Sequence, residues 1–257
     1  MWNADLYERF GKERIQPSID LAAKIEGAPD TILDVGCGSG MSTLCLRNRF
    51  PNAKITGVDL SAEMLEKAGQ LFLDADFLQK DCSQSMEELG KFDLVFANAF
   101  LQWLDNQEEF LCNIHKNMNE GAALAMQIPA FHQMTISDIV IDTADRCFPK
   151  RFSAVRRVRN FSLQQYYDMF SRYFAQVTMW KTDYIHQFDN SDRIVEFVRG
   201  TALIPYMERL NDAECAQFLA ELKKQTKNAY PASENGTVLF AFQRMFFVAK
   251  DPIGGKR

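Results

Sequence analysis

The stretch Ile32-Leu33-Asp34-Val35-Gly36-Cys37-Gly38-Ser39-Gly40 determines the fold that we expect for this 257-residue chain. It begins in a short apolar run, 31–35, and leads into a segment with helical spacing, 42–50. Glycines at a strand-to-helix turn permit unusual backbone angles and let a ligand approach the main chain, while the first turn of the helix offers N–H groups that lack helical partners. The stretch therefore predicts a ligand-binding turn.

Strand-like and helix-like segments alternate around this turn. The sequence predicts a helix over 17–26, strands over 31–35, 53–58, 76–79, 92–97 and 122–128, a helix that begins at Ser61 and another over 107–118. The strands are continuous apolar runs, which indicates a parallel sheet covered on both faces. After Pro129 the alternation breaks. A helix-and-loop segment (131–160) precedes a helix (163–170), a strand (177–184), a mainly helical stretch interrupted near Pro205 (192–227) and a long strand (238–249).

Acidic residues beside the turn indicate the kind of ligand. Asp59 ends the second strand about twenty residues after the turn, where a carboxylate can accept hydrogen bonds from both hydroxyls of a ribose. A dinucleotide site usually has the spacing G-x-G-x-x-G, but this turn has G-x-G-x-G after Asp34. Since Asp34 would attract an ammonium and repel a pyrophosphate, the turn favours a nucleoside with an amino-acid head and disfavours an NAD-dependent reductase.

The composition excludes several other classes. The net charge of −5 argues against a general nucleic-acid binder. The six cysteines form no C-x-x-C pair and match no zinc spacing, so we expect no metal site and a reduced, cytoplasmic setting. Neither a signal peptide nor a membrane-spanning run is expected. Asn98 is not followed by two prolines, and Pro129 is not followed by cysteine, which disfavours enzymes that methylate nucleic-acid bases.

The segment 34–40 resembles the first motif of class I S-adenosylmethionine-dependent methyltransferases, and 92–98 resembles their fourth-strand motif. The resemblance implies a Rossmann-like, doubly wound α/β fold: a mostly parallel seven-stranded sheet with the last strand antiparallel, plus a helical cap. It implies S-adenosyl-L-methionine as cofactor, with Asp81 and the backbone of Cys82 at the adenine and Asn98 near the methionine head. The full set of expected cofactor-binding residues is Asp34, Gly36, Gly38, Asp59, Leu60, Met64, Asp81, Cys82 and Asn98.

We expect a single methyltransferase domain over 1–257. Within it, 1–30 forms an N-terminal helical cover, 31–128 the cofactor-binding core, and 129–160 with 187–236 a helical cap that contributes to the substrate site. From Trp2 to about Lys250 the chain resembles the family of trans-aconitate methyltransferases. The segments that carry this resemblance are Tyr7-x-x-Phe10 with Arg14 and Pro17, the glycine turn, Asn98-Ala99-x-Leu101-Gln102-Trp103-Leu104, Trp180-x-Thr182-x-Tyr184-x-His186-Gln187, and Tyr230-Pro231 through Glu234-Asn235-Gly236 to Phe242-x-Arg244-x-Phe246.

This second resemblance implies methyl transfer to one carboxylate of a small tricarboxylic acid. The family tends to have an arginine before the proline that corresponds to Pro205, where this chain has Ile204, so Arg199 or Arg209 would have to substitute. A carboxylate is already ionised at pH 7, so no catalytic acid or base is required. The partner is then a small anionic carboxylic acid, and neither a nucleic acid nor a membrane; the oligomeric state is left open.

Four residues are expected to position the acceptor. Arg244 would hold a carboxylate in bidentate geometry, or else point to water from an edge strand. Tyr184 and His186 lie two apart, so on a strand they share a face and either donate hydrogen bonds to an oxyanion or pack across strands. Trp103 would wall the methyl-transfer site, or be an ordinary core residue.

Two alternative functions remain open at this point. The first is carboxyl methylation of a carrier-bound malonyl group, for which an acidic carrier protein would need a basic patch. The sequence offers Lys150, Arg151, Arg156, Arg157 and Arg159, although such a run is usually a solvated face. The second is a non-catalytic module that binds S-adenosylmethionine.

Overall fold

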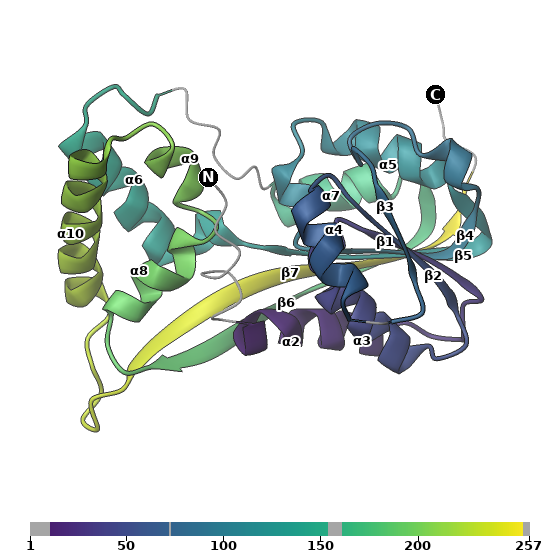
Figure 1. Cartoon of the computed structure of the whole chain (residues 1–257), viewed down its shortest axis with the longest axis horizontal. Helices are drawn as coiled ribbons and strands as arrows, with labels where there is room; N and C mark the ends of the chain where they lie inside the picture. Colours follow the sequence, from purple (N-terminus) through teal and green to yellow (C-terminus); the bar gives the residue numbers. More distant parts are fainter. Residues whose placement is uncertain (1–10, 72, 154–160, 254–257) are drawn as a thin grey trace. The chain divides into compact units, whose positions relative to one another are not determined.

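A seven-stranded mixed sheet forms the framework of the computed structural model, which describes residues 11–71, 73–153 and 161–253 (Figure 1). The strand order is β3-β2-β1-β4-β5-β7-β6. Strands β1 to β5 pair in parallel, and β7 runs antiparallel to β5. This confirms the predicted sheet, including its antiparallel last strand. The strands are β1 (Thr31–Val35), β2 (Lys54–Asp59), β3 (Asp76–Gln79), β4 (Phe92–Asn98), β5 (Met118–Pro129), β6 (Phe174–Phe188) and β7 (Val238–Pro252).

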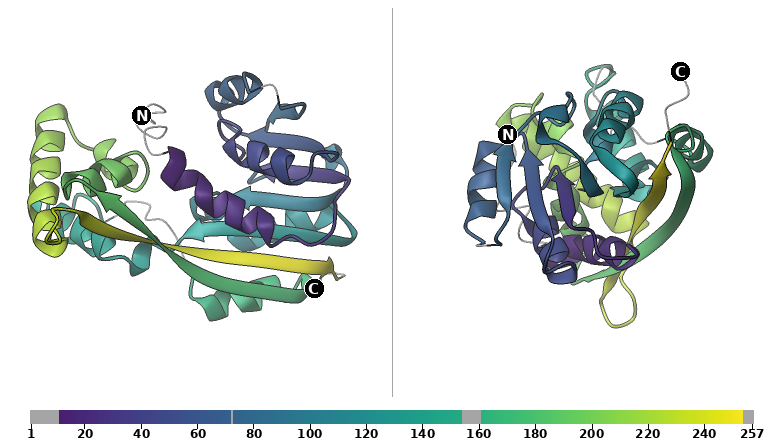
Figure 2. Two further views of the ribbon diagram at one scale, coloured as in Figure 1. Left: turned by 90° about the horizontal axis from the view of Figure 1, so that it is seen from below. Right: turned by 90° about the vertical axis from the view of Figure 1, so that its right-hand side faces the viewer.

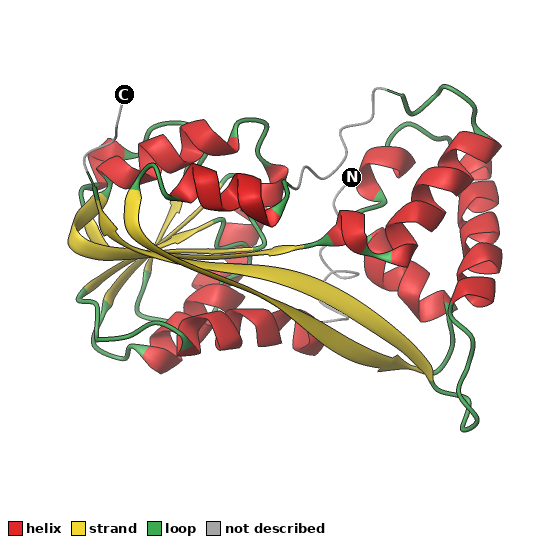
Figure 3. Cartoon of the chain, turned by 180° about the vertical axis from the view of Figure 1, so that it is seen from behind, coloured by secondary structure: helices red, strands yellow, loops and turns green. Residues whose placement is uncertain are grey.

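Helices cover both faces of this sheet, with α5 and α7 on one face and α3 on the other (Figures 1 and 3). On the first of these faces, the ring of Phe247 in β7 stacks on Phe170 in α7 with centroids 5.1 Å apart. The helices among the described residues are α2 (Gly11–Ala23), α3 (Met41–Arg49), α4 (Ala62–Gly69), α5 (Gln107–Lys116), α6 (Thr135–Cys147), α7 (Leu163–Phe170), α8 (Asp192–Arg199), α9 (Ile204–Met207) and α10 (Asp212–Ala229). Short 3-10 turns occur at η1 (Glu87–Leu89), η2 (Leu101–Trp103) and η3 (Phe131–Gln133).

The described chain divides into two compact units, each considered by itself. The sheet unit comprises 15–71, 73–129, 161–181 and 244–253, and contains the glycine turn. The helical unit comprises 11–14, 130–153 and 182–243. The neighbouring 15-residue strands β6 and β7 contribute to both units (Figure 2). The helical unit has its own aromatic core, in which Phe197, Phe218 and Phe240 are fully buried.

Local sequence signals account for most helix starts. The Ser61 hydroxyl accepts a hydrogen bond from the backbone of Met64 and begins α4 as predicted. Ser162 and Asn211 form capping boxes at α7 and α10. The prediction for the first helix was wrong at its start, because α2 begins at Gly11 and Pro17 lies inside it. Proline favours the first turn of a helix, which is why the sequence suggested a start there.

The fifth and sixth strands are longer than predicted. β5 begins at Met118 instead of residue 122, because Met118 pairs with Phe92 and a register shift accommodates the polar residues that follow it. β6 extends over 174–188 instead of 177–184. Its exposure alternates along most of its length, as expected for a strand with one half-buried face.

One arginine holds the loops that precede β2 and β3. The guanidinium of Arg47 donates hydrogen bonds of 2.7–3.0 Å to the backbone carbonyls of Pro51, Ala53, Leu73 and Asp74. Backbone carbonyls in loops lack the partners that helices and strands provide, and Arg47 supplies a hydrogen-bond donor to these four. In the described part of the chain, the helices are too short or too polar to cross a bilayer.

Candidate cofactor and acceptor site

The glycine turn after β1 adopts a backbone that glycine favours. Gly36 and Gly38 have φ values of 68° and 54°. A Cβ atom at Gly36 would lie 2.5 Å from the ring of Phe100, so this glycine makes room for the aromatic side chain that follows β4. A Cβ atom at Gly38 would meet only the methyl group of Met64, at 3.7 Å. The open side of the turn is therefore at Gly38, where a ligand can approach the backbone.

Asp59, at the end of β2, holds this turn in place. Its Oδ2 accepts a hydrogen bond from the backbone N–H of Gly38, and its Oδ1 accepts one from the N–H of Ser61, both at 2.9 Å. Each carboxylate oxygen can accept a further hydrogen bond, so the half-buried side chain retains capacity for ribose hydroxyls. The next residue, Leu60, is 65% exposed, an unusual position for a leucine and a suitable surface for an apolar ring.

Asp34, which precedes the turn, is fully buried beneath it. Its Oδ2 accepts hydrogen bonds from the hydroxyls of Ser42 (2.8 Å) and Thr43 (2.6 Å) in α3. Burial raises the pKa of Asp34 to about 6, although the hydrogen bonds from Thr43 and Ser42 oppose the rise. Its Oδ1 has no hydrogen-bond partner among the described residues. The contact with a cationic head that the sequence assigned to Asp34 remains a prediction.

The loop after β3 lies against the glycine turn. The carbonyl of Val58 accepts hydrogen bonds from the N–H groups of Gly36 and Cys37, and the sulfur of Cys82 lies 4.0 Å from the same carbonyl oxygen. Burial raises the pKa of the Cys82 thiol to about 12. Asp81 is exposed, and hydrogen bonds from the hydroxyl and backbone N–H of Ser83 lower its pKa. The two residues lie where the sequence expected them, and their contact with adenine remains a prediction.

A row of polar side chains crosses the ends of β4 and β5 and the middle of β7. Gln127 in β5 is completely buried; its Nε2 donates to Asn98 Oδ1 at 2.5 Å, and its Oε1 accepts from Arg244 at 3.3 Å. Arg244 is 5% exposed and belongs to an inner strand, so the alternative in which it points to water from an edge strand is wrong. The sequence analysis missed Gln127, although a lone glutamine in the apolar run 122–128 was a usable signal.

Trp103 lies close to this row along the chain. Five residues after Asn98, it closes the 3-10 turn η2 and is half-buried, unlike the buried Leu101 two residues before it. The turn is preceded by Ala99, whose φ of 55° is rare for a residue with a side chain. Because strained backbone of this kind gathers at functional sites, the geometry agrees with a role for Trp103 at the site, which remains a prediction.

The other predicted acceptor residues belong to the helical unit. Tyr184 and His186 alternate with exposed neighbours along β6, which confirms that they share a face. The ring of His186 lies 5.4 Å from that of Phe197, and the guanidinium of Arg14 lies 4.5 Å from the same ring. Arg14 also donates a hydrogen bond to the carbonyl of Phe197 at 2.8 Å. His186 thus packs in an aromatic cluster, and its proposed hydrogen bond to an acceptor remains a prediction.

Several basic side chains that the sequence analysis considered can also be placed. Arg199 and Arg209 are exposed, and Arg209 donates a hydrogen bond to the carbonyl of Pro205. Arg151 forms an ion pair with Glu214. Other residues discussed above lie outside the described residues: Tyr7, Phe10, Arg156, Arg157 and Arg159.

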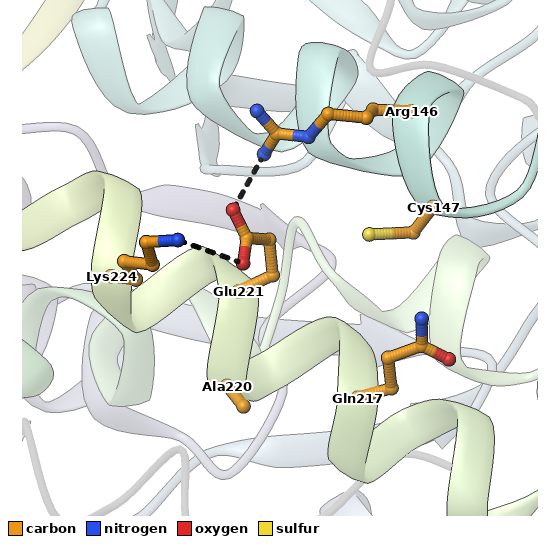
Figure 4. Close-up of a pocket in the computed structure, with 6 residues that line it drawn as sticks. All are labelled: Arg146, Cys147, Gln217, Ala220, Glu221 and Lys224. Atoms are coloured by element: carbon orange, nitrogen blue, oxygen red, sulfur yellow. Dashed lines mark hydrogen bonds and ion pairs between the residues drawn. The ribbon is translucent and has the colours of Figure 1, made fainter.

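The helical unit contains a pocket whose lining includes none of the predicted site residues. It is lined by Arg146, Cys147, Gln217, Ala220, Glu221 and Lys224 of α6 and α10 (Figure 4). The carboxylate of Glu221 lies 3.0 Å from Arg146 and 3.9 Å from Lys224, so both cationic side chains already have an anionic partner. Within the described ranges, no group of three or more His, Cys, Asp or Glu side chains is placed to hold a metal ion.

Comparisons with known proteins define the class. Residues 32–121 match the family model for a methyltransferase domain. The fold is shared with the YcgJ protein of Bacillus subtilis (TM-score 0.61, 15% identity, 95% of this chain and 100% of that chain). It is also shared with phosphoethanolamine N-methyltransferase 2 of Haemonchus contortus (TM-score 0.57, 14% identity, 92% and 52%). The chain is thus an S-adenosylmethionine-dependent methyltransferase of Rossmann-like fold, with S-adenosyl-L-methionine as its cofactor.

Two curated relatives define the family. The trans-aconitate 2-methyltransferase of Paracidovorax citrulli is 36% identical over 255 residues, which cover 97% of this chain and 98% of the relative. That of Escherichia coli O157:H7 is 34% identical over 251 residues, with coverage of 97% and 98%. This chain belongs to the trans-aconitate 2-methyltransferase family, as its sequence motifs predicted.

Proposed function

We propose that this enzyme esterifies one carboxylate of trans-aconitate or of a closely related small polycarboxylic acid. The observation that carries the proposal is the similarity to trans-aconitate 2-methyltransferases over 97% of the chain. The position of Arg244 supports it: its side chain, 5% exposed, donates to Gln127 near the end of β5, and Gln127 in turn donates to Asn98, which we assign to the methionine head. A buried arginine favours an anionic ligand because the low dielectric strengthens their attraction.

We assign the cofactor contacts as follows. The carboxylate of Asp59 accepts the ribose hydroxyls, and the exposed face of Leu60 covers the adenine with Met64, Asp81 and the backbone of Cys82. Asp34, the Gly36–Gly38 backbone and Asn98 surround the amino-acid head. The bound cofactor supplies a methyl group on a sulfonium, which is electrophilic enough to be attacked by a carboxylate oxygen.

The residues of the chain then have only to bind, orient and exclude water. The acceptor carboxylate is ionised at pH 7, so no side chain has to remove a proton. Arg244 holds a carboxylate that does not react, and thereby aligns the reacting one. Trp103 removes water from the reacting oxygen, which makes it a better nucleophile. Tyr184 and His186 are proposed as further hydrogen-bond donors to the acceptor.

We propose the same roles for the segments of the chain as the sequence predicts. Residues 31–128 bind the cofactor, 1–30 cover it, and 129–160 with 187–236 contribute to acceptor selection. Ile204 stands where the family resemblance implies an arginine, so we propose that another cationic side chain holds one carboxylate of the acid. A cytoplasmic setting and a small-molecule partner, without nucleic acid or membrane, complete the proposal.

The test is incubation with isotopically labelled S-adenosylmethionine and a panel of di- and tricarboxylic acids, with methyl esters read by mass. We expect a monomethyl ester of trans-aconitate or a close analogue. Ester formation only on malonyl-acyl carrier protein would favour the carrier-bound alternative, and cofactor binding without any ester would indicate a non-catalytic module. Arg244→Lys retains the charge but loses the planar fork, and should raise the KM of the acid about 10- to 100-fold while cofactor affinity changes little.

A further inference from the structure

We propose that Gln127 is a positioning residue which, held by Arg244, orients the amide of Asn98 so that its N–H donors are presented to a carboxylate. This inference rests on the proposed function, because it names the group that the donors recognise. It gives a role to Gln127, which the sequence motifs do not include, between Arg244, assigned to the acceptor, and Asn98, assigned to the cofactor.

The sheet register places the three side chains on one face. Asn98 pairs with Gln127 between β4 and β5, and Gln127 pairs with Phe246 between β5 and β7. Arg244 lies two residues before Phe246, and residues two apart on a strand share a face. Phe247, which points the opposite way, stacks on Phe170 of α7. The polar row therefore lies on the face of the sheet away from α7.

Burial makes the hydrogen bonds of Gln127 necessary. Its side chain is 0% exposed and lies between the apolar residues Met126 and Ile128, which are equally buried. A buried amide without hydrogen-bond partners destabilises the folded protein, because nothing compensates for the water that it has lost. Gln127 avoids this cost through its contacts with Asn98 at 2.5 Å and Arg244 at 3.3 Å.

The chemistry of arginine fixes the direction of this row. A guanidinium has donors and no acceptor, so the atom of Gln127 that faces Arg244 has to be Oε1. The other end of the same amide, Nε2, then faces Asn98 and can only donate. Asn98 must consequently present Oδ1 to Gln127. Its Nδ2, with two N–H donors, has no hydrogen-bond partner among the described residues and belongs to a half-buried side chain.

Groups that offer N–H donors and no acceptor atom recognise an anion. The Nδ2 group of Asn98 and the guanidinium of Arg244 together offer only N–H groups, which suit a carboxylate and would not bind an ammonium. A carboxylate can come from two sources in the proposed complex: the amino-acid head of the cofactor and the polycarboxylic acceptor. We infer that the donors bind a carboxylate, and the experiments below distinguish the carboxylate of the cofactor from that of the acceptor.

The first experiment replaces the donors of Asn98 by an acceptor of the same shape. Titration calorimetry of Asn98→Asp would measure the affinity for S-adenosylhomocysteine and for 5′-methylthioadenosine, which lacks the amino-acid head. If the cofactor carboxylate is the ligand, the first affinity falls about 10-fold or more and the second is unchanged. If the acceptor carboxylate is the ligand, both affinities are unchanged and the KM of the acid rises about 10-fold at saturating cofactor. No change in any of these quantities, or tighter binding of S-adenosylhomocysteine, would overturn the inference.

The second experiment tests the positioning role of Gln127. Gln127→Glu offers only acceptors, so it should draw Nδ2 of Asn98 inward and reproduce the defect of Asn98→Asp. Gln127→Leu keeps the volume, releases Asn98 and should show a smaller defect of about 3- to 10-fold. The positioning role would be refuted if Gln127→Glu had the wild-type KM for the acid and the wild-type ratio of affinities for S-adenosylhomocysteine and 5′-methylthioadenosine.

A matched control separates positioning from stability. Asn117 is another fully buried amide, whose Nδ2 donates to the carbonyls of Met86 and Gly90 at 2.7 Å. Asn117→Ala should lower the melting temperature without changing the affinity ratio or the KM of the acid. If wild-type protein fails to bind S-adenosylhomocysteine, the proposed function itself fails. If wild-type protein binds it and Asn98→Asp behaves as wild type, only this inference fails.

Discussion

The carboxylate of Asp59 accepts a hydrogen bond from the backbone N–H of Gly38 at 2.9 Å. It accepts a second one from the N–H of Ser61, which begins α4. The side chain that we propose to bind ribose thus also holds the glycine turn, and we expect cofactor affinity and turn geometry to depend on the same group.

Asp59→Ala should weaken binding of S-adenosylhomocysteine by about 1–3 kcal/mol, because ribose hydrogen bonds are lost and the N–H of Gly38 loses its partner. Asp59→Asn should also weaken it, since an amide has a single acceptor oxygen for the two backbone donors. Titration calorimetry measures both. Asp76→Ala removes an exposed carboxylate of β3 and should leave the affinity as it is. Equal affinities in all four proteins would remove Asp59 from the site.

Burial raises the pKa of Asp34 from its usual value of 3.8 to about 6, which makes the stability of the protein depend on pH. Because the folded state holds this proton more tightly, the stabilising contribution is complete below about pH 3.8 and is lost as pH rises through about 6. At 1.36 kcal/mol per pKa unit, the loss is about 3 kcal/mol. Urea unfolding from pH 4 to 7 should therefore show the difference in unfolding free energy, wild type minus Asp34→Asn, falling with pH. A pH-independent difference would contradict the raised pKa.

Gly36→Ala and Gly38→Ala should behave differently although both have positive φ. At Gly36 the strain of about 1–2 kcal/mol adds to overlap with Phe100, for a total of about 2–5 kcal/mol. At Gly38 the strain stands alone, and the main loss should be in cofactor affinity. Chemical denaturation tests the first statement and calorimetry the second. Phe100→Ala should partly compensate Gly36→Ala in a double-mutant cycle, and strictly additive effects would refute the steric explanation.

The thiols should differ in reactivity with iodoacetamide at pH 8. Burial raises the pKa of Cys82 to about 12 and that of Cys37 well above its usual range, so both remain protonated and unreactive. Cys112 is exposed and should react first. Peptide mass spectrometry of the folded protein at successive times gives the order. Labelling of Cys82 as fast as that of Cys112 would show that the loop after β3 opens readily.

The glycine turn and its surroundings were predictable because local signals there agree. The bounds of β1, β3 and α7 are those predicted, since turn residues or caps delimit each apolar run. The polar beginning of β5 could not be anticipated. Asn119, Glu120 and Gly121 carry no strand signal, and only the pairing of Met118 with Phe92 includes them.

The hydrogen bonds of the candidate site residues were harder to predict than their positions at the strand ends. Asp34 and Asp59 were singled out from spacing, but their partners Ser42, Thr43 and Gly38 depend on how α3 starts and where β2 ends. Gln127 was missed because its partners come from strands 29 and 117 residues away along the chain. Strand register, which no local pattern encodes, brings such residues together.

Among the described residues, Arg47 donates its hydrogen bonds to backbone carbonyls before β2 and β3, which are neutral dipoles and not ions. Salt screens the attraction between exposed ions such as Lys54 and Asp76, which lie 4.0 Å apart on the same strands. It has little effect on short hydrogen bonds to neutral oxygens. The strands that lead to Asp59 and Asp81 are therefore anchored by contacts that tolerate high ionic strength. Rising salt should lower the affinity for the acid before it lowers the affinity for the nucleoside part of the cofactor.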